Sequence, residues 1–245
     1  MSSELLITVC TFNEAENIGS LLLELRRVAP NADILVIDDN SPDETADLVK
    51  QHSRSDSQVD VVVRTSNKGL GASTVDGFRY GIEHKYRYLL NLDADFSHQP
   101  KHIPDLLAAM ETHDVCIGSR YIPGGSITGW KWTRHVMSRC VNLYVHIWLG
   151  LKAKDSSGSF RCYHVAKLAE IDWNKTVSRG YAFQEEVLYR CQRIECSFTE
   201  VPIAFEDRTR GTTNLNTKEI VRAIWDLFKL GIHRLRGTSV THDSN

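Results

Sequence analysis

Short apolar runs rich in β-branched residues alternate with amphipathic stretches through the first 117 residues, and this alternation constrains the fold more than any other feature. The runs have the length of buried strands, and the stretches between them have the periodicity of helices. We therefore predict strands at Leu5–Val9, Ile34–Ile37, Val59–Val63, Tyr88–Leu92 and Val115–Ile117. Such an alternation is typical of an α/β fold with a mostly parallel central sheet flanked by helices.

Capping residues predict where the first two helices begin. Asn13 stands before the first amphipathic stretch with Glu16 three residues later, which predicts Asn13 as the N-cap. Ser41–Pro42 predicts the start of the second helix, with Asp43 and Glu44 in its first turn.

A different pattern begins after about residue 118, where a glycine-rich loop over 124–129 comes first. We then expect helices near 133–149, 183–193 and 216–235, a loop around 155–161 and a strand near 197–203. No repeat or low-complexity linker separates the halves, so we expect one domain over 1–235 with a C-terminal helical extension folded onto the sheet. Residues 236–245 are expected to form a flexible tail.

The two halves carry opposite charge. The whole chain has 29 Lys and Arg against 31 Asp and Glu, which argues against a general nucleic-acid binder. Residues 1–117 carry 10 basic and 19 acidic side chains (−9), and residues 118–245 carry 19 and 12 (+7). This asymmetry suits a site in which the acidic half binds a cation and the basic half binds phosphates. Two unrelated biases in composition would give the same net charges.

Cysteine usage and hydropathy indicate the compartment. The six cysteines include no Cys-x-x-Cys pair, which argues against a structural zinc site or a disulfide framework. The longest apolar stretch, 141–151, is interrupted by Asn142 and His146 and does not predict a membrane span. We therefore expect a cytoplasmic protein whose membrane contact is peripheral.

The strand ends carry carboxylates where other nucleotide-binding folds carry glycines. The first strand runs into 10–14 without glycine, which excludes a dinucleotide-binding turn and a P-loop, and 69–71 is typical of a plain turn. Asp38 and Asp39 follow the second strand, and Asp93 and Asp95 follow the fourth. Because residues two apart in an extended segment point the same way, Asp93 and Asp95 can reach one Mg²⁺ or Mn²⁺. A lone Asp-x-Asp is more often a solvated turn, but the buried strand and the second acidic pair favour a metal site.

Four segments of the first half resemble the family-2 glycosyltransferases, which have the Rossmann-like GT-A fold: Thr11–Glu14, Ile37–Asp43, Asn67–Gly71 and Asp93–His98. Further segments resemble dolichyl-phosphate (polyprenyl-phosphate) mannosyltransferase catalytic subunits without a transmembrane domain: Gly118–Tyr121, Gly129–Trp130 with Arg134 and Ser138, Asp155–Arg161, Gly180–Glu186, and Phe205–Arg208 with Gly211. The similarity covers about residues 5–235. It implies a nucleotide-sugar half over 1–117 and an acceptor half over 118–235.

The resemblance implies roles residue by residue. Asp93 and Asp95 would bind the metal. Arg120 and Arg208 stand at positions where the family has arginines that contact phosphate. The resemblance implies that these two arginines and the two aspartates are the catalytic residues. Arg120, Arg134 and Ser138 would bind the acceptor phosphate. The remaining residues that the resemblance assigns to the nucleotide sugar are Glu14, Ile37, Asp39 and Ala94.

Three nucleotide-sugar positions depart from the family pattern. Cys10 and Phe12 stand where the family usually has Pro and Tyr, which affects the expected nucleotide preference. Asn214 stands where a Lys normally contacts the donor, and Arg210 or Lys218 is a candidate to compensate for that charge.

The chemistry of glycosyl transfer agrees with these residue types. A divalent cation and arginines place positive charge where the departing nucleoside diphosphate gains negative charge. An acceptor phosphate is already ionised near neutral pH and needs no general base.

Simpler interpretations compete at several other charged residues. A solvated surface charge is favoured for Arg139, and a role as a structural partner of arginines is favoured for Asp155 and Glu186. His98 has no second His or Cys at ligand spacing, which argues against a role in the site.

The leading hypothesis is therefore metal-dependent, inverting transfer of mannose from GDP-mannose to dolichyl or polyprenyl phosphate. Two alternatives stay open: transfer from UDP-glucose or another nucleotide sugar, and a non-catalytic module that binds nucleotide sugars. The expected partners are the cytoplasmic face of a membrane and, as a further candidate, a separate membrane anchor protein.

Two helices should face the acceptor and the lipid. The helix near 133–149 places Arg134, Ser138 and Asn142 opposite an apolar face formed by Val136, Cys140, Leu143 and Ile147. In the last helix the apolar side chains spread over roughly 220°. We expect part of that arc to pack on the protein and the rest, including Trp225 or Phe228, to meet a membrane. A fully buried helix is the alternative.

Overall fold

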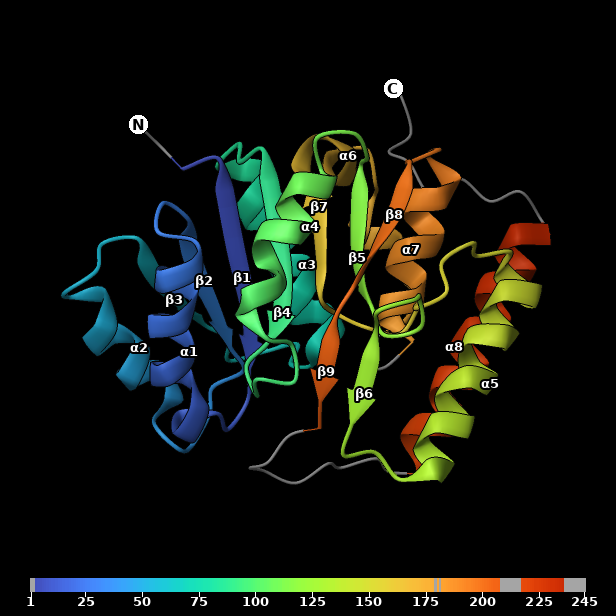
Figure 1. The fold of residues 1–245 in the computed structure, drawn as a ribbon, viewed down its shortest axis with the longest axis horizontal. Helices are drawn as coiled ribbons and strands as arrows, with labels where there is room; N and C mark the ends of the chain where they lie inside the picture. Colours follow the sequence, from blue (N-terminus) through green and yellow to red (C-terminus); the bar gives the residue numbers. More distant parts are fainter. Residues whose placement is uncertain (1–2, 179, 181, 208–216, 236–245) are drawn as a thin grey trace.

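The computed structural model describes residues 3–178, 180, 182–207 and 217–235. A seven-stranded sheet with the order β3-β2-β1-β4-β7-β5-β8 forms its centre (Figure 1). Its strands are β1 Leu5–Thr11, β2 Asp33–Asp38, β3 Val59–Val63, β4 Tyr88–Asp93, β5 Val115–Ser119, β7 Arg161–His164 and β8 Phe198–Pro202. A second, two-stranded parallel sheet pairs β6 Ser126–Thr128 with β9 Ala204–Glu206.

Helices cover both faces of the large sheet because apolar residues alternate along its strands. Ile7 and Val36 point to one face, where α1 Ala15–Val28, α2 Thr45–Ser53 and α4 Ile103–Ala109 pack. Leu6 and Leu35 point to the other, where α3 Leu70–Glu83, α6 Val165–Ala169 and α7 Phe183–Arg193 pack. Two 3₁₀ turns, Pro100–His102 and Trp173–Lys175, complete these layers.

The predicted strands and the mostly parallel sheet are confirmed, but three described strands were not predicted. β6 lies inside the expected glycine-rich loop over 124–129 and pairs with β9, and the third, β7, belongs to the large sheet. β7 runs antiparallel between β4 and β5. Its sequence, Arg161–His164, contains a fully buried arginine and no apolar run, so the hydrophobic pattern gives no sign of a strand. The predicted strand near 197–203 is β8, which pairs parallel with β5.

Both predicted helix starts are wrong. Asn13 has a left-handed φ of 60°, which is not the extended conformation of an N-cap, and α1 begins at Ala15. The backbone N–H of Ala15 donates to Asp43 of the next loop, so a distant side chain satisfies this helix end. Glu44 is also left-handed, and α2 begins only at Thr45, whose N–H donates to Asp43.

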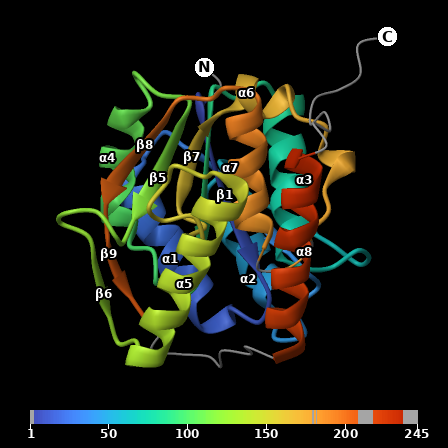
Figure 2. The same cartoon turned by 90° about the vertical axis from the view of Figure 1, so that its right-hand side faces the viewer.

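The helices α5 Trp132–Leu149 and α8 Thr217–Leu235 lie side by side at one edge of the molecule (Figures 1 and 2). In α8, Leu227 and Leu230 are buried whereas Trp225 is 54% exposed, so the fully buried alternative is wrong. In α5, Ile147 is 68% exposed. Among the described residues, no helix is long and apolar enough to cross a membrane.

Candidate active site

The carboxyl ends of β1, β2 and β4 meet at one edge of the sheet. In the strand register Thr11 lies opposite Asp38 and Cys10 lies opposite Asp93, so the two predicted acidic pairs come from strands that flank β1. Asp38 is fully buried and accepts hydrogen bonds from the Thr11 hydroxyl at 2.9 Å and from the Ser41 hydroxyl at 2.6 Å. The Asp38 carboxylate therefore stabilises the turn after β2. Asp39 is the first residue after this strand.

Asp39, expected at the nucleotide, is held from two sides. The backbone N–H of Gly69 donates to one of its carboxylate oxygens at 2.6 Å. The buried Arg64 donates to the other and also pairs with Asp76 at 2.8 Å. Gly69 has φ 124°, a conformation that favours glycine, and it is the N-cap of α3, which begins at Leu70. Residues 69–71 are therefore a helix start beside Asp39 and not the plain turn that the sequence predicts.

The other residues expected at the nucleotide surround this edge without forming one cluster. Phe12 is 56% exposed. Cys10 lies beside Thr74, and burial raises the pKa of its thiol to about 12, so it stays protonated. Glu14 accepts a hydrogen bond from the Asn17 amide, and the Ile37 side chain is in the core, so only the backbone of Ile37 could reach a ligand.

The expected metal-binding residues, Asp93 and Asp95, both line the cavity described below. Asp93 accepts a hydrogen bond from the Ser159 hydroxyl at 2.7 Å, and Asp95 accepts one from the backbone N–H of Ser97 at 3.0 Å. Ala94, between them, is buried. The carboxylates are therefore oriented by β4, by the turn that follows it and by the loop before β7.

His98 is a component of this site, contrary to the prediction. Its Nδ1 accepts a hydrogen bond from the backbone N–H of Asp93 at 3.3 Å, and its ring packs against Phe160 and Phe205. Burial lowers its pKa, so the imidazole is uncharged near neutral pH. Through this hydrogen bond His98 supports the turn that follows β4, and it also lines the cavity.

Arg120 is bound by Asp155, as the favoured interpretation of Asp155 predicts. Its Nε and Nη2 donate to the two carboxylate oxygens of Asp155 at 2.7 and 2.6 Å. Burial disfavours the charge of Asp155, but Arg120 outweighs this effect and holds the pKa of the carboxyl below its usual range. The guanidinium also lies over the Trp130 and Phe205 rings, so Arg120 is a fixed cation beside the cavity.

The acceptor residues predicted on α5 reach the same cavity. Arg134 pairs with Asp207 at 2.7 Å and lies over the Trp130 ring, and Ser138 accepts a hydrogen bond from the Tyr121 hydroxyl. Cys140 lines the cavity with them, which corrects its expected place on the opposite face, and Arg139 is exposed as expected.

Four of the predicted donor-side residues fall outside the part of the structure that can be described. Arg208, Arg210 and Asn214 lie in the segment 208–216, and the side chain of Lys218 is likewise not described.

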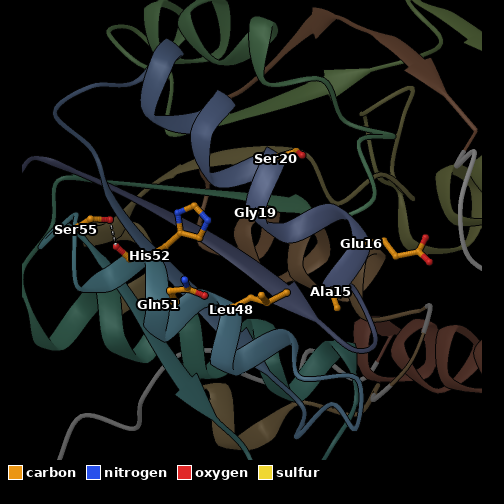
Figure 3. Close-up of a pocket in the computed structure, with 8 residues that line it drawn as sticks. All are labelled: Ala15, Glu16, Gly19, Ser20, Leu48, Gln51, His52 and Ser55. Atoms are coloured by element: carbon orange, nitrogen blue, oxygen red, sulfur yellow. Dashed lines mark hydrogen bonds between the residues drawn. The ribbon is translucent and has the colours of Figure 1, made fainter.

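One cavity of about 530 Å³ joins these groups. Asp93, Asp95, Arg120 and Arg134 lie on its polar side, and α5 and α8 form an apolar wall with Met137, Val141, Tyr144, Ala223, Ile224 and Leu227. A second hollow, between α1 and α2, contains Glu16 and His52 but none of the predicted site residues (Figure 3).

The resemblance includes the segment Gly180–Glu186 but assigns no role to Gln184 and Glu185, which line the cavity from the start of α7. Each is only 3% exposed, and no hydrophobic or spacing pattern singles them out. The neighbouring Glu186 has the expected structural role, because it pairs with Arg190 at 2.7 Å and accepts the N–H groups of residues 177 and 178.

The donor set suits a divalent cation. Mg²⁺ is usually bound by one or two carboxylates together with waters and substrate phosphates, and Asp93 and Asp95 provide two carboxylates beside the cavity. Among the described residues, no group of three or more Asp, Glu, His and Cys side chains could hold a metal on its own. A cation here would therefore take its further oxygen ligands from water and from a bound substrate.

The central, mostly parallel sheet with helices on both faces is a GT-A-like fold. Solved structures agree on the fold: glucosyl-3-phosphoglycerate synthase from Mycobacterium tuberculosis, in complex with Mn²⁺, UDP and glucosyl-3-phosphoglycerate, has a TM-score of 0.65. The match covers 96% of this chain and 80% of that one at 15% identity. A complex of the same enzyme with Mn²⁺, UDP-glucose and phosphoglyceric acid has a TM-score of 0.67, 14% identity and coverage of 93% and 79%.

The chain belongs to glycosyl transferase family 2, whose sequence model matches residues 6–172. It is 37% identical to an undecaprenyl-phosphate mannosyltransferase from Micrococcus luteus over 227 residues, 93% of either chain. It is 36% identical over 229 residues to a polyprenol monophosphomannose synthase from Mycolicibacterium smegmatis, which covers 93% of this chain and 86% of the relative.

Proposed function

We propose that this enzyme transfers mannose from GDP-mannose to dolichyl or another polyprenyl phosphate, with inversion at the anomeric carbon. The observation that carries the proposal is the shared cavity, which is lined by the Asp93 and Asp95 carboxylates, by Arg120 and Arg134, and by an apolar wall from α5 and α8. The names of the two mannosyltransferase relatives support mannose as the sugar and a polyprenyl phosphate as the acceptor.

The first half of the chain would bind the donor. Asp39, Glu14 and the backbone of Ile37 lie near the carboxyl ends of the strands, where α/β sheets bind ligands. Cys10 and Phe12 would border the base, and Arg208 and Asn214 are proposed as further donor contacts. Asp93 and Asp95 would hold Mg²⁺ or Mn²⁺, which would stabilise the negative charge of the diphosphate.

The second half would bind the acceptor phosphate. Arg134 and Ser138 lie one helical turn apart on α5 and line the cavity, and Arg120 faces them from the end of β5. Charge-assisted hydrogen bonds from two arginines suit a phosphate that is withdrawn from water. We therefore treat residues 1–235 as one domain, because its two halves supply the two sides of this cavity.

The chemical step follows from the charge of the acceptor. An oxygen of the ionised phosphate attacks the anomeric carbon of mannose, and the bond to the nucleoside diphosphate breaks on the opposite side of that carbon. No proton has to leave the nucleophile, so the step needs no general base. The arginines orient the attacking phosphate and balance its charge.

The lipid part of the acceptor would use α5 and α8. Met137 and Val141 on α5 and Ile224 and Leu227 on α8 form an apolar continuation of the cavity beside Ser138. The outer surface of the same helices exposes Trp132, Ile147 and Trp225, which suits insertion into a lipid interface. We propose peripheral attachment to the cytoplasmic face of a membrane, with a separate anchor protein as a further partner.

A donor and acceptor panel tests the proposal. Radiolabelled GDP-mannose, UDP-glucose and UDP-GlcNAc are each incubated with the enzyme, Mg²⁺ or Mn²⁺, and a short-chain polyprenyl phosphate. We expect a labelled lipid product from GDP-mannose that disappears when a chelator removes the metal. Preferential use of UDP-glucose would show that UDP-glucose, and not GDP-mannose, is the donor. The absence of product with every donor would favour a non-catalytic binding module.

A further inference from the structure

The helix α5 is anchored by apolar burial at one end only. In this helix, which is described in full, the buried side chains are Val145 and Leu149, and both belong to its last two turns. Arg134 and Ser138, which line the cavity, lie in the first half of the helix, where Val136 is exposed. The hydrophobic core therefore does not by itself determine where these two residues lie, and polar contacts must contribute to their position.

Asn142 joins α5 to the loop that precedes β7. Its Oδ1 atom accepts hydrogen bonds from the backbone N–H of Ser156 at 2.8 Å and from the Ser156 hydroxyl at 2.6 Å. Its Nδ2 atom donates to the carbonyl of Ser138, one helical turn earlier, at 2.9 Å. Asn142 is not among the residues that line the cavity. This side chain therefore connects the acceptor helix to another part of the protein and does not contact a ligand in the cavity.

The partner of Asn142 has a fixed position beside the cavity arginine. Ser156 is fully buried and directly follows Asp155, whose two carboxylate oxygens bind Arg120. The backbone N–H of Asp155 also donates to Glu200 of β8 at 3.1 Å, so the loop is attached to the large sheet. The contact between Asn142 and Ser156 therefore sets the position of α5 relative to Arg120.

We propose that Asn142 is a positioning residue for the acceptor: it holds α5 so that Arg134 and Ser138 contact the same phosphate as Arg120. This inference rests on the proposed function, which assigns the acceptor phosphate to these three residues. Groups on two different elements bind one phosphate together only if the elements keep their separation. A displacement of about 1 Å can lower a rate by roughly 100-fold.

Steady-state kinetics of Asn142→Ala test the proposal. This substitution leaves the N–H and the hydroxyl of Ser156 without their acceptor and frees the first half of α5. We expect the KM for a short-chain polyprenyl phosphate to rise roughly 10-fold, while the KM for GDP-mannose stays nearly unchanged. An unchanged acceptor KM, or equal increases in both KM values, would overturn the inference.

A double-mutant cycle separates positioning from an unrelated structural effect. If Asn142 acts by placing Arg134, its substitution should matter much less once Arg134 has been replaced by alanine. We therefore expect the acceptor KM of the double variant to exceed that of Arg134→Ala by less than about 3-fold. If the two increases multiply, the residues act independently and Asn142 has no positioning role toward Arg134.

A second variant and a matched control accompany these measurements. Ser156→Ala removes the hydroxyl donor but keeps the backbone N–H, so its acceptor KM should rise only about 2- to 3-fold. If Asn142→Ala is unfolded at the assay temperature, Ser156→Ala decides, and an acceptor KM equal to that of the wild type then contradicts the inference. Asn174 is exposed, accepts a hydrogen bond from Arg79 at 2.9 Å and does not line the cavity. Asn174→Ala should therefore have the wild-type KM for both substrates.

A failure of the inference can be distinguished from a failure of the proposed function. A wild type that transfers no sugar contradicts the proposed function, and the inference is then decided by isothermal titration with the polyprenyl phosphate. Weaker binding by Asn142→Ala than by the wild type supports the inference, and equal binding overturns it. A wild type that binds no polyprenyl phosphate contradicts both.

Discussion

Asp93 and Asp95 are residues whose substitution should affect catalysis without unfolding the chain. Each accepts a hydrogen bond, from the Ser159 hydroxyl and from the Ser97 backbone, that an asparagine oxygen can also accept. Asp93→Asn and Asp95→Asn should each lower turnover about 10²-fold or more, because a charge that holds the metal is lost. The change in melting temperature should be small. Normal turnover of both variants in limiting Mn²⁺ would refute the metal assignment.

Glu185 should make stability depend on pH. Burial raises the pKa of Glu185 to about 7, from an ordinary value of 4.5. Between these values the folded chain binds more protons than the unfolded chain, so the contribution of Glu185 to stability falls as pH rises through this window. Glu185→Gln should raise the free energy of unfolding at pH 8 by up to about 3 kcal/mol and change it little at pH 4.5.

Denaturant unfolding of the wild type and Glu185→Gln at several pH values measures this difference. If the free energies of unfolding of the wild type and of Glu185→Gln changed with pH in the same way, the raised pKa of Glu185 would be contradicted.

At the scale of the elements, a substitution on the cavity face of α5 should weaken binding of the acceptor and leave binding of the donor nearly unchanged. Arg134 lines the cavity, whereas Arg139 on the same helix is exposed and does not. Arg134→Ala should raise the KM for polyprenyl phosphate roughly 10-fold or more, with the KM for the donor nearly unchanged, because it removes a charge-assisted hydrogen bond. Arg139→Ala is the control and should behave as the wild type. An unchanged acceptor KM in Arg134→Ala would mean that this helix face is only solvated.

The exposed apolar side chains of α5 and α8 should bind membranes. In flotation with anionic liposomes that contain polyprenyl phosphate, the protein should rise with the liposomes at low salt and be released at high salt. Trp225→Glu and Ile147→Glu should weaken flotation, whereas Leu23→Glu, at an exposed position on α1, should not. Protein that stays in the aqueous layer at low salt, with or without the lipid phosphate, would contradict direct docking.

The sequence predicts elements best where a local pattern determines them. The strands of the first half and α7 have clear apolar periodicity and are found where expected. The start of α1 could not be located, because the N–H group of Ala15 is satisfied by Asp43, which is 28 residues away in the chain. The predicted start of α2 is too early, because Glu44 adopts a left-handed conformation and Asp43 accepts the N–H of Thr45 locally. β7 could not be predicted, because its buried Arg161 is stabilised by carbonyls from other segments.

For the molecule as a whole, the cavity is the feature that no local pattern reveals. Strand-end carboxylates and the resemblance predicted Asp93, Asp95, Arg120, Arg134 and Ser138, and the fold brings all five to one cavity. Gln184, Glu185 and His98 join them only through tertiary packing. The opposite charges of the two halves also meet there, with acidic groups at β4 and arginines at β5 and α5.

The central claim is that this cavity transfers a sugar to an anionic lipid without a general base. The most direct test compares a short-chain polyprenyl phosphate with the corresponding polyprenol as acceptors, using radiolabelled GDP-mannose and Mg²⁺ or Mn²⁺. The phosphate is already a nucleophile, whereas the alcohol must lose a proton. We predict a labelled mannosyl lipid with the polyprenyl phosphate and none with the polyprenol. Equal transfer to both lipids, or no lipid product with the phosphate, would contradict the account.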